Sequence, residues 1–579
     1  MPDNEVALRE CYDELSKEFP IELVDYIPEG SDQRKIDVPV WKFSIIAEVF
    51  GKVDTVEAYM AFPREFPYLM PYVVVPEERF SLLPHISVAS RKLCLYEDSV
   101  VYDTENIVGL IRDCISKTRK WLELYSNQDN TEEYTKEIDS YWNEQYEGET
   151  EVESHWILLG QMPNESCELQ GYLYSVDFLG EIGKYFDQCV VCGADVSENI
   201  LNNIKTKYSA HKITVQYIKS MKIPSMPPYS IKGSQLLERI ENEDDKNRFT
   251  KFINKNLEGY FLFPLGLDYI LGGVIIPKQK VINRSGYRNG YLRATDILTK
   301  YESKNKKFGR IKVGLYEETR MAKRTAGQLM KHQNFVVAGL GSVGSNLCYY
   351  LNGYNNASFA LVDPDNLTID NMGRHLLGFN YLDQRKAYSV ADYLNLYRPD
   401  REVKPIAKRI ELIPADSFNQ ASAIFLCTGD IMSEKWLLNK MQNKEITQPT
   451  FFLWLEPYGI SGIMIYVAPD DTESISALRA EANDKFMKYC LIEHTEYERG
   501  DKLTKHDAGC NGNYALYSAN DVTLFLSAMF PYIDRLLENP DTTQILQWVG
   551  NVEIANQREI NLAERADGLS KGQVLNLNL

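Results

Sequence analysis

Apolar and polar positions divide the chain into stretches with helical or strand-like periods. A helical period runs from Asn4 to Phe19, and strand-like runs follow at 41–50 and 56–62. Further strand-like runs lie at 156–159, 171–178, 213–218, 260–263 and 272–277. Apolar residues three or four positions apart predict helices, whereas short apolar runs bounded by turn residues predict strands. Together these elements predict a multidomain protein of mixed α/β and α+β class.

Residues 335–365 predict a strand, a glycine turn, a helix and a second strand. Gly339 allows a tight turn, Gly341 lets backbone amides approach a phosphate, and Gly344 permits close packing of the helix on the strand. The N-terminus of the helix offers unpaired amides and a partial positive charge to an anion. Asp363 ends the second strand, where a carboxylate can accept hydrogen bonds from ribose hydroxyls. The segment therefore predicts a site for ATP or a dinucleotide.

Cations that follow this segment favour an adenylating enzyme over a dehydrogenase. Arg374 and Lys386 come shortly after Asp363. Hydride transfer needs no further phosphate-binding cations there, whereas attack on the α-phosphate of ATP spreads charge over oxygens that Arg or Lys stabilises. Asp430 follows an apolar strand, at the carboxyl end where open α/β sheets place ligands. We predict that Asp430 holds Mg²⁺.

In order and spacing, residues 330–550 resemble the ThiF/ubiquitin-activating superfamily at Gly339, Gly341, Gly344, Asp363, Asn371, Arg374, Lys386 and Asp430. The resemblance implies a Rossmann-like adenylation domain that binds ATP through these residues. It further implies that the arginine and the lysine contact phosphates and that Asp430 binds magnesium and the adenylate. Members that feed sulfur pathways usually carry two CxxC pairs for zinc, which this region lacks.

A single cysteine is the second part of that resemblance. The polar, small-residue segment from Lys505 to Gly512 predicts a loop that exposes Cys510. Activating enzymes that form a thioester carry a cysteine after the adenylation strands, so the resemblance implies that Cys510 accepts the acyl group. Attack on an acyl-adenylate needs a thiolate, which exposure and a nearby cation such as His506 favour. An incidental loop cysteine is the alternative.

The first 145 residues resemble a ubiquitin-conjugating domain. A Tyr-Pro-rich turn at 63–72 follows the helix and sheet, and Cys94 then lies between two leucines. The resemblance implies that Cys94 is a catalytic thiol, and a buried structural thiol is the alternative. The His-Pro-Asn tripeptide of eukaryotic members is missing upstream of the cysteine. His85 is a candidate for part of its oxyanion-stabilising role, unless it is a packed or solvent-facing histidine.

The combination resembles the fused conjugating-activating proteins of bacterial CBASS anti-phage operons. We expect a ubiquitin-conjugating-like domain at 1–148, a linker domain at 149–315 and a ThiF-like adenylation domain at 316–579. Tyr134, Ile138, Trp142 and Tyr146, at helical spacing, predict a terminal helix of the first domain. The resemblance implies that the C-terminus of a cGAS/DncV-like nucleotidyltransferase is adenylated, passed from Cys510 to Cys94 and ligated to a target amine. Because adenylating relatives usually dimerise, it also implies a homodimer.

Composition limits the remaining choices. The chain has 579 residues, too many for one core, and its formal net charge of −19 disfavours general nucleic-acid or anionic-membrane binding. The acidic, polar start does not resemble a signal peptide, and the apolar stretch at 260–277 is interrupted by Pro264 and Asp268. We predict a cytoplasmic protein with reduced thiols. Cys189 and Cys192 form a single CxxC, which favours two core thiols over a zinc site.

Two other functions stay open. In the first, the protein adenylates a sulfur carrier, Cys510 is incidental, and the first 145 residues bind a partner. In the second, the protein is a nonenzymatic assembly factor or a nucleotide-sensing switch whose ATP site only binds. The cations and the acid after the glycine turn argue against the second, because a sensor needs fewer groups at the α-phosphate.

Overall fold

The computed structural model describes residues 2–29, 32–88, 90–96, 101–143, 152–177, 185–227, 233–256, 259–266, 269–276, 308–499, 502–506, 513–540 and 542–579. The chain forms two compact units, one of Met1–Asp195 with Lys205–Glu317 and one of Val196–Ile204 with Glu318–Leu579. The longer segment of the second unit starts at Glu318, near the expected start of the adenylation domain, whereas Val196–Ile204 lies within the expected linker domain. The expected boundary at 148 lies outside the described residues and stays a prediction. In the described part of the chain, every helix is too short or too polar to cross a membrane.

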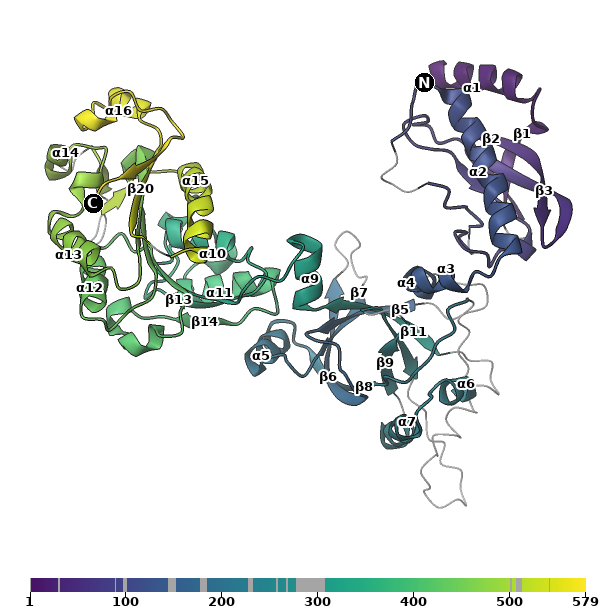
Figure 1. The fold of residues 1–579 in the computed structure, drawn as a ribbon, viewed down its shortest axis with the longest axis horizontal. Coiled ribbons are helices and arrows are strands. Elements are labelled where there is room, and N and C mark those ends of the chain that lie inside the picture. Colours follow the sequence, from purple (N-terminus) through teal and green to yellow (C-terminus); the bar gives the residue numbers. More distant parts are fainter. Residues whose placement is uncertain are drawn as a thin grey trace. The chain divides into compact units, whose positions relative to one another are not determined.

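The first unit begins with a four-stranded antiparallel sheet of β1 (Ile21–Glu29), β2 (Asp32–Val49), β3 (Lys52–Ala61) and β4 (Tyr72–Val74). Along the end of β2, Ile45, Ala47 and Val49 are buried while the residues between them are exposed, so the period of two turns one face inward. That face packs on α1 (Pro2–Leu15) and α2 (Ile107–Asn127). Figure 1 shows α2 lying across these strands. The helix and the two strands predicted for this region are thereby confirmed.

A closed seven-stranded barrel forms the rest of the first unit. In barrel order its strands are β10 (Leu271–Ile276), β11 (Gly309–Tyr316), β5 (Val152–Leu159), β7 (Tyr185–Cys192), β6 (Cys167–Asp177), β8 (His211–Tyr217) and β9 (Gly259–Pro264). Among the described residues, α6 (Gly233–Glu238) and α7 (Glu243–Asn256) lie between β8 and β9 in the sequence. α5 (Glu198–Lys207) lies between β7 and β8 in the sequence, and most of it groups with the second unit. Cys189 and Cys192 are buried in β7, as expected for core thiols, and burial raises the pKa of Cys192 to about 12.

Two short helices, α3 (Thr131–Lys136) and α4 (Ile138–Asn143), replace the single terminal helix predicted from the spacing of Tyr134, Ile138 and Trp142. Trp142 is fully buried, and its indole Nε1 donates to the carbonyl of Ile311 on β11 at 2.9 Å. Arg310 Nη1 donates to the Trp142 carbonyl at 2.8 Å. The helical period is therefore explained by packing on the barrel and on Leu82 and Val88 of the N-terminal region.

The second unit is built on an eight-stranded sheet. Its first five strands in spatial order, all parallel, are β14 (Val403–Ile406), β13 (Ala357–Val362), β12 (Gln333–Ala338), β15 (Ala423–Leu426) and β16 (Thr450–Leu455). Antiparallel strands β17 (Ser461–Val467), β20 (Gln544–Val549) and β21 (Val574–Leu577) extend it. A separate hairpin pairs β18 (Thr504–His506) with β19 (Asn513–Ala515). The expected Rossmann-like arrangement is confirmed for this unit.

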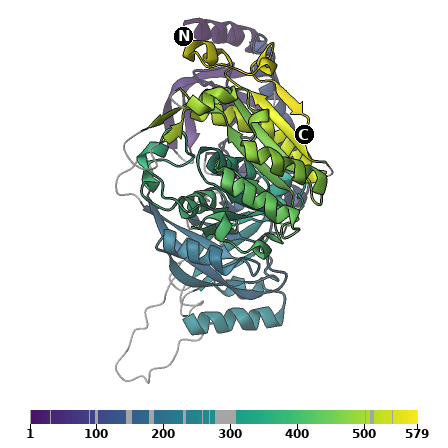
Figure 2. The same cartoon turned by 90° about the vertical axis from the view of Figure 1, so that its left-hand side faces the viewer.

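Helices cover both faces of the large sheet. One apolar core lies beneath α10 (Ser342–Leu351), α11 (Lys386–Tyr397) and α15 (Ala519–Glu538), and another lies beneath α12 (Ile431–Gln442) and α13 (Thr472–Glu481). The remaining helices are α9 (Glu318–Thr325), α14 (His494–Arg499) and α16 (Glu553–Arg558). Figures 1 and 2 show the helices flanking the strands. Because the central strands are covered on both sides, their sequences are nearly continuous apolar runs.

Candidate functional site

The turn between β12 and α10 has the geometry expected of its glycines. Gly339 has a φ of +85°, and a Cβ there would lie 2.6 Å from the backbone nitrogen of Thr428. A Cβ on Gly344 would lie 1.9 Å from the Gly339 carbonyl oxygen, so helix and turn pack closely. A Cβ on Gly341, by contrast, would meet no heavy atom within 4 Å. The backbone at Gly341 therefore faces open space at the N-terminus of α10.

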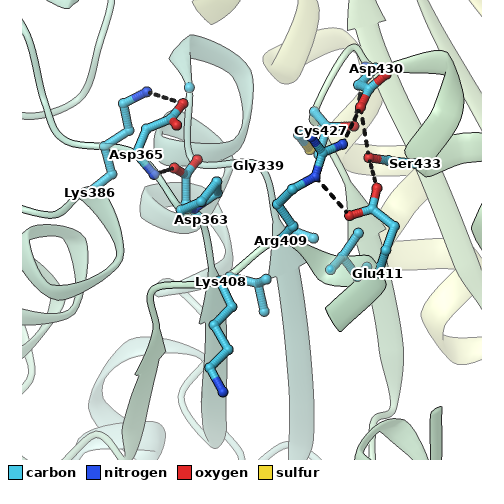
Figure 3. A pocket seen from close by; sticks show the side chains of 16 residues that line it. Gly339, Asp363, Asp365, Lys386, Lys408, Arg409, Glu411, Cys427, Asp430 and Ser433 are labelled. Atoms are coloured by element: carbon cyan, nitrogen blue, oxygen red, sulfur yellow. Dashed lines mark hydrogen bonds and ion pairs between the residues drawn. The ribbon is translucent and has the colours of Figure 1, made fainter. Parts of the chain in front are cut away.

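A pocket of about 280 Å³ opens beside this turn, at the carboxyl ends of the four adjacent parallel strands β14, β13, β12 and β15. Its lining includes Gly339, Gly341, Asp363, Asp365, Lys386, Lys408, Arg409, Glu411, Cys427, Asp430 and Ser433. In Figure 3, Asp365 and Lys386 lie on one side of Asp363 and Gly339. The group of Arg409, Glu411, Asp430 and Ser433 lies on the other side. The fold therefore brings together five residues predicted for the nucleotide site, namely Gly339, Gly341, Asp363, Lys386 and Asp430.

Asp363 is a buried acceptor fixed by the backbone. Its side-chain oxygens accept from the Leu340 amide at 2.7 Å and from the Asp365 amide at 2.8 Å, and the residue is 4% exposed. Burial raises the pKa of Asp363, and the positive charge of Lys386 opposes that shift. A carboxylate has about four acceptor positions, so two remain for a ligand. Asp363 can therefore accept hydrogen bonds from two hydroxyls without moving.

Lys386 provides the positive charge on the same side of the pocket. It is the first residue of α11 and only 8% exposed. Its Nζ lies 3.4 Å from Asp365 Oδ2, a long ion pair with an exposed carboxylate. Because one partner is largely in water, this pair holds the ammonium weakly. The ammonium can therefore turn to an anionic ligand at modest cost.

Asp430, at the end of β15, is held differently. One oxygen caps α12 by accepting from the Met432 amide at 3.0 Å. The other lies 3.0 Å from Arg409 Nη2 and 3.2 Å from the Ser433 hydroxyl. Arg409 also donates from Nε to Glu411 at 3.2 Å. Burial works against the ionised form of Glu411, but hydrogen bonds from Arg409 and Ser433 prevail and lower its pKa.

The carboxylates of Asp430 and Glu411 are suitable ligands for Mg²⁺. Asp430 and Glu411 supply carboxylate oxygens, which Mg²⁺ prefers, and this ion commonly takes one or two carboxylates and completes its shell with phosphates and water. Within the described ranges, no three His, Cys, Asp or Glu side chains gather as a metal cluster. The residues present thus suit a magnesium ion that arrives with a phosphate ligand.

Two predicted nucleotide contacts, Asn371 and Arg374, lie outside this pocket. Asn371 accepts from the Thr368 amide at 3.1 Å and closes a 3₁₀ turn. Arg374 donates to the Ala515 carbonyl at 2.7 Å and lies over the ring of Tyr517, 4.8 Å from its centre. Asn371 is therefore held by a local turn, and Arg374 by a hydrogen bond to the last residue of β19. Contact of Asn371 and Arg374 with ATP stays a prediction.

Of the two predicted catalytic thiols, the structure describes Cys94 but not Cys510. Cys510 lies outside the described residues, between β18 and β19. Cys94 is exposed, and its amide donates to the His85 carbonyl at 2.8 Å. Isolated bridges pair Val74 with Lys92 and Ile86 with Leu93, which fixes the backbone just before the thiol. Of the cysteines that the structure describes, Cys94 is the exposed one, so the alternative of a buried thiol is wrong.

The ring of His85 faces the short helices rather than a free surface. Its Nδ1 lies 3.2 Å from Glu137 and its Nε2 lies 3.6 Å from Glu133. The backbone amide of His85 donates to the Tyr141 hydroxyl at 3.2 Å. These contacts favour the packed histidine over the oxyanion-stabilising one.

Arg409, Glu411 and Ser433 also line this pocket and were not predicted from the sequence. A signal was present, since Lys408 and Arg409 form a basic pair just after β14, at the carboxyl end of a parallel strand. The carboxyl ends of neighbouring parallel strands meet at one edge of a sheet. Placing 403–406 as the edge strand beside β13 would have brought Arg409 to the pocket.

Comparison with known proteins agrees with this architecture. Residues 319–541 match the ThiF family, and residues 37–150 match Prokaryotic E2 family B. The chain thus contains an N-terminal E2-like domain and a C-terminal ThiF adenylation domain, and this combination is that of ubiquitin-like activation and conjugation.

Several solved structures are similar to parts of the chain. PaaA is 12% identical, with 38% of this chain and 69% of PaaA covered and a TM-score of 0.29. The E. coli tRNA N6-threonylcarbamoyladenosine dehydratase TcdA, solved with AMP, is 13% identical over 38% of this chain and 94% of its own, with a TM-score of 0.26. E. coli MccB with ATP is 12% identical over 57% and 81%, with a TM-score of 0.27. No protein of curated function matches the sequence.

Proposed function

We propose that the protein uses ATP to adenylate the C-terminal carboxylate of a protein partner and then conjugates that partner to an amine. The observation that carries this proposal is the pocket that collects the glycine turn, Asp363, Lys386 and Asp430 at one edge of the ThiF sheet. The exposed Cys94 of the E2-like domain supports the conjugation step.

In the first step ATP is the substrate. The open backbone at Gly341 and the N-terminus of α10 offer amides to its phosphates. Asp363 has two acceptor positions left for ribose hydroxyls, and Lys386 balances phosphate charge. A magnesium ion at Asp430 would neutralise charge on the phosphates. The partner's carboxylate oxygen bonds to the α-phosphorus, the bond to the bridging oxygen breaks, and pyrophosphate leaves.

The acyl group then passes through two thioesters. The Cys510 thiolate attacks the acyl carbon of the adenylate, and AMP leaves. The Cys94 thiolate attacks the thioester carbon, and the Cys510 thiolate leaves. A neutral amine on the target finally attacks the Cys94 thioester, forms an amide and releases the thiol. Thiolates rather than thiols act as nucleophiles, so both cysteines need access to water or a cation.

The partner follows from the resemblance to bacterial fused conjugating-activating proteins. We propose a cGAS/DncV-like nucleotidyltransferase as the acyl donor, a protein amine as the acceptor and a role in anti-phage defence. A cytoplasmic homodimer, in which one thiol can reach the other across two chains, completes the proposal.

The test incubates the protein with MgATP and the candidate partner, then compares reducing and nonreducing gels for wild type, Cys94→Ala and Cys510→Ala. We expect a thiol-sensitive adduct that Cys510→Ala abolishes. We expect Cys94→Ala to retain the adduct on Cys510 while losing the final conjugate. Cys167→Ala, which removes a half-buried barrel thiol, is the control and should behave as wild type. A partner lacking its C-terminal residue should give no adduct.

Other outcomes separate the rival functions. AMP release with product formation intact in Cys94→Ala would support a sulfur-carrier adenylating enzyme. ATP binding without AMP release, for every partner tested, would support a sensor or an assembly factor.

A further inference from the structure

Arg409 lies against Asp430, the residue at which the proposed function would place a magnesium ion. Its Nη2 lies 3.0 Å from Asp430 Oδ2, and its Nε lies 3.2 Å from Glu411 Oε2. The other oxygen of Asp430, Oδ1, already accepts the Met432 amide at the start of α12. A metal that binds through Oδ2 would therefore meet the guanidinium of Arg409, which lies against that oxygen.

Ser433 joins the two acids into one cluster. Its hydroxyl oxygen lies 2.5 Å from Glu411 Oε1 and 3.2 Å from Asp430 Oδ2. A hydroxyl carries one proton, so it donates to one carboxylate at a time. A positive charge stabilises two neighbouring carboxylates. Arg409 supplies that charge, whereas Lys408 points away from both acids in Figure 3.

The ion pair is weak enough to be exchanged. The Arg409 side chain is 57% exposed and that of Asp430 is 40% exposed, so water screens their attraction. A guanidinium and a divalent cation repel each other and cannot both remain against one oxygen. The displaced guanidinium needs a new anion. The triphosphate of the substrate is the anion that reaches this pocket under the proposed function.

We propose that a divalent metal displaces Arg409 from Asp430, and that the displaced guanidinium binds a phosphate oxygen of the nucleotide. No covalent bond changes in this exchange. The phosphate half of the proposal rests on the proposed function, whereas displacement by the metal can be measured on the protein alone. As a consequence, metal alone binds poorly, and metal and nucleotide promote each other's binding.

The test uses the full-length chain with Arg409→Gln. Binding of Mn²⁺ alone is followed by electron paramagnetic resonance, and binding of ATP at saturating Mn²⁺ is followed by calorimetry. We expect Mn²⁺ alone to bind Arg409→Gln about tenfold more tightly than wild type, because a competing charge is gone. We expect ATP to bind the variant roughly tenfold more weakly, the size of one charge-assisted hydrogen bond. A purely structural role would not move the two affinities in opposite directions.

Three variants sharpen the result. Lys440→Gln breaks another ion pair of α12, that of Lys440 Nζ with Glu445 at 2.5 Å, and should match wild type in both assays. Asp430→Asn combined with Arg409→Gln should lose the gain in Mn²⁺ affinity. Arg409→Lys keeps the charge and should retain weak Mn²⁺ binding, even if Arg409→Gln folds poorly.

Two results would overturn the proposal. Equal Mn²⁺ affinity in wild type, Arg409→Lys and Arg409→Gln would show that the metal does not displace Arg409. Unchanged ATP affinity in Arg409→Gln would show that the guanidinium does not bind the phosphate. Failure of every protein, wild type included, to bind ATP would instead speak against the proposed function, while the Mn²⁺ series would still report on Arg409.

Discussion

Asp363 and Asp430 both follow parallel strands of the same sheet, yet they are held in opposite ways. Asp363 is 4% exposed, and backbone amides hold both of its oxygens. Asp430 has a side chain that is 40% exposed, with one oxygen capping α12 and the other shared between Arg409 and Ser433. Both oxygens of Asp363 are held by backbone amides, whereas only one oxygen of Asp430 is, and the other is held by side chains that can move away. Position at a strand end therefore determines that an acid lies in the pocket, while its partners determine whether it can exchange ligands.

Replacing Asp363 by asparagine should have the largest effect. In wild type, one backbone N–H donates to each oxygen of Asp363. Asparagine has only one acceptor oxygen, so its NH₂ group would face one of these two N–H donors. We expect kcat/KM for ATP–pyrophosphate exchange to fall roughly 1000-fold, as for two lost charge-assisted hydrogen bonds. We also expect about 1–3 kcal/mol of lost stability, because a buried donor is left unsatisfied.

A matched control for that variant is Asp416→Asn, which makes the same chemical change at an exposed position outside the pocket. It should leave both the exchange rate and the unfolding midpoint near wild type. If Asp363→Asn retained wild-type exchange, Asp363 would be a structural residue alone, and the contrast with Asp430 would lose its functional meaning.

Replacing Asp430 by asparagine should separate activity from stability. The amide oxygen can still accept from Met432, since asparagine is as good an N-cap as aspartate. The lost pair with Arg409 is exposed and contributes at most about 1 kcal/mol. We expect ATP–pyrophosphate exchange to fall roughly 100-fold, the loss of about 3 kcal/mol of charge stabilisation by a metal. Exchange measured across a magnesium titration, beside thermal unfolding, checks both parts; a large drop in midpoint with unchanged exchange would contradict them.

The same contrast explains how far the sequence could predict the site. The contacts of Asp363 and the packing of Gly344 are fixed within the strand, turn, helix and strand of one continuous segment. A local motif therefore contained the information. The partner of Asp430 comes from the loop after β14, a strand that lies three places away from β15 in the sheet. Only the strand order, which periodicity does not reveal, brings Arg409 to that acid.

Other differences between prediction and structure have the same origin. Arg374 donates to the Ala515 carbonyl, a partner far along the chain that the sequence did not predict, while its predicted contact with phosphate stays a prediction. The helical period of Tyr134 and Trp142 was read as one helix, but packing on the barrel divides it into α3 and α4. Domain type, strand positions and the residues of local motifs followed from the sequence. Side-chain partners supplied by distant elements did not.

Glu434 offers the smallest and most selective way to examine the surroundings of Asp430. It lies in the first turn of α12, and burial, with a further contribution from the charge of Asp430, raises its pKa to about 7. In the unfolded chain a glutamate ionises near pH 4.5. Between those values the folded state keeps a proton that the unfolded state has lost. Stability contributed by this group is therefore full below pH 4.5 and is lost as the pH rises to about 7.

We expect Glu434→Gln, measured without metal, to gain stability over wild type as the pH rises from about 4.5 to 7, by up to about 3 kcal/mol. Unfolding midpoints of the two proteins across that range give the measurement. Glu473→Gln, at an exposed first-turn glutamate of α13, should show no such trend. In an Asp430→Asn background the gain should shrink, because one cause of the raised pKa is gone, whereas Asp363→Asn should leave it unchanged. If the stability gain of Glu434→Gln were the same with and without Asp430→Asn, burial alone would set the pKa of Glu434. The charge of Asp430 would then already be neutralised by Arg409.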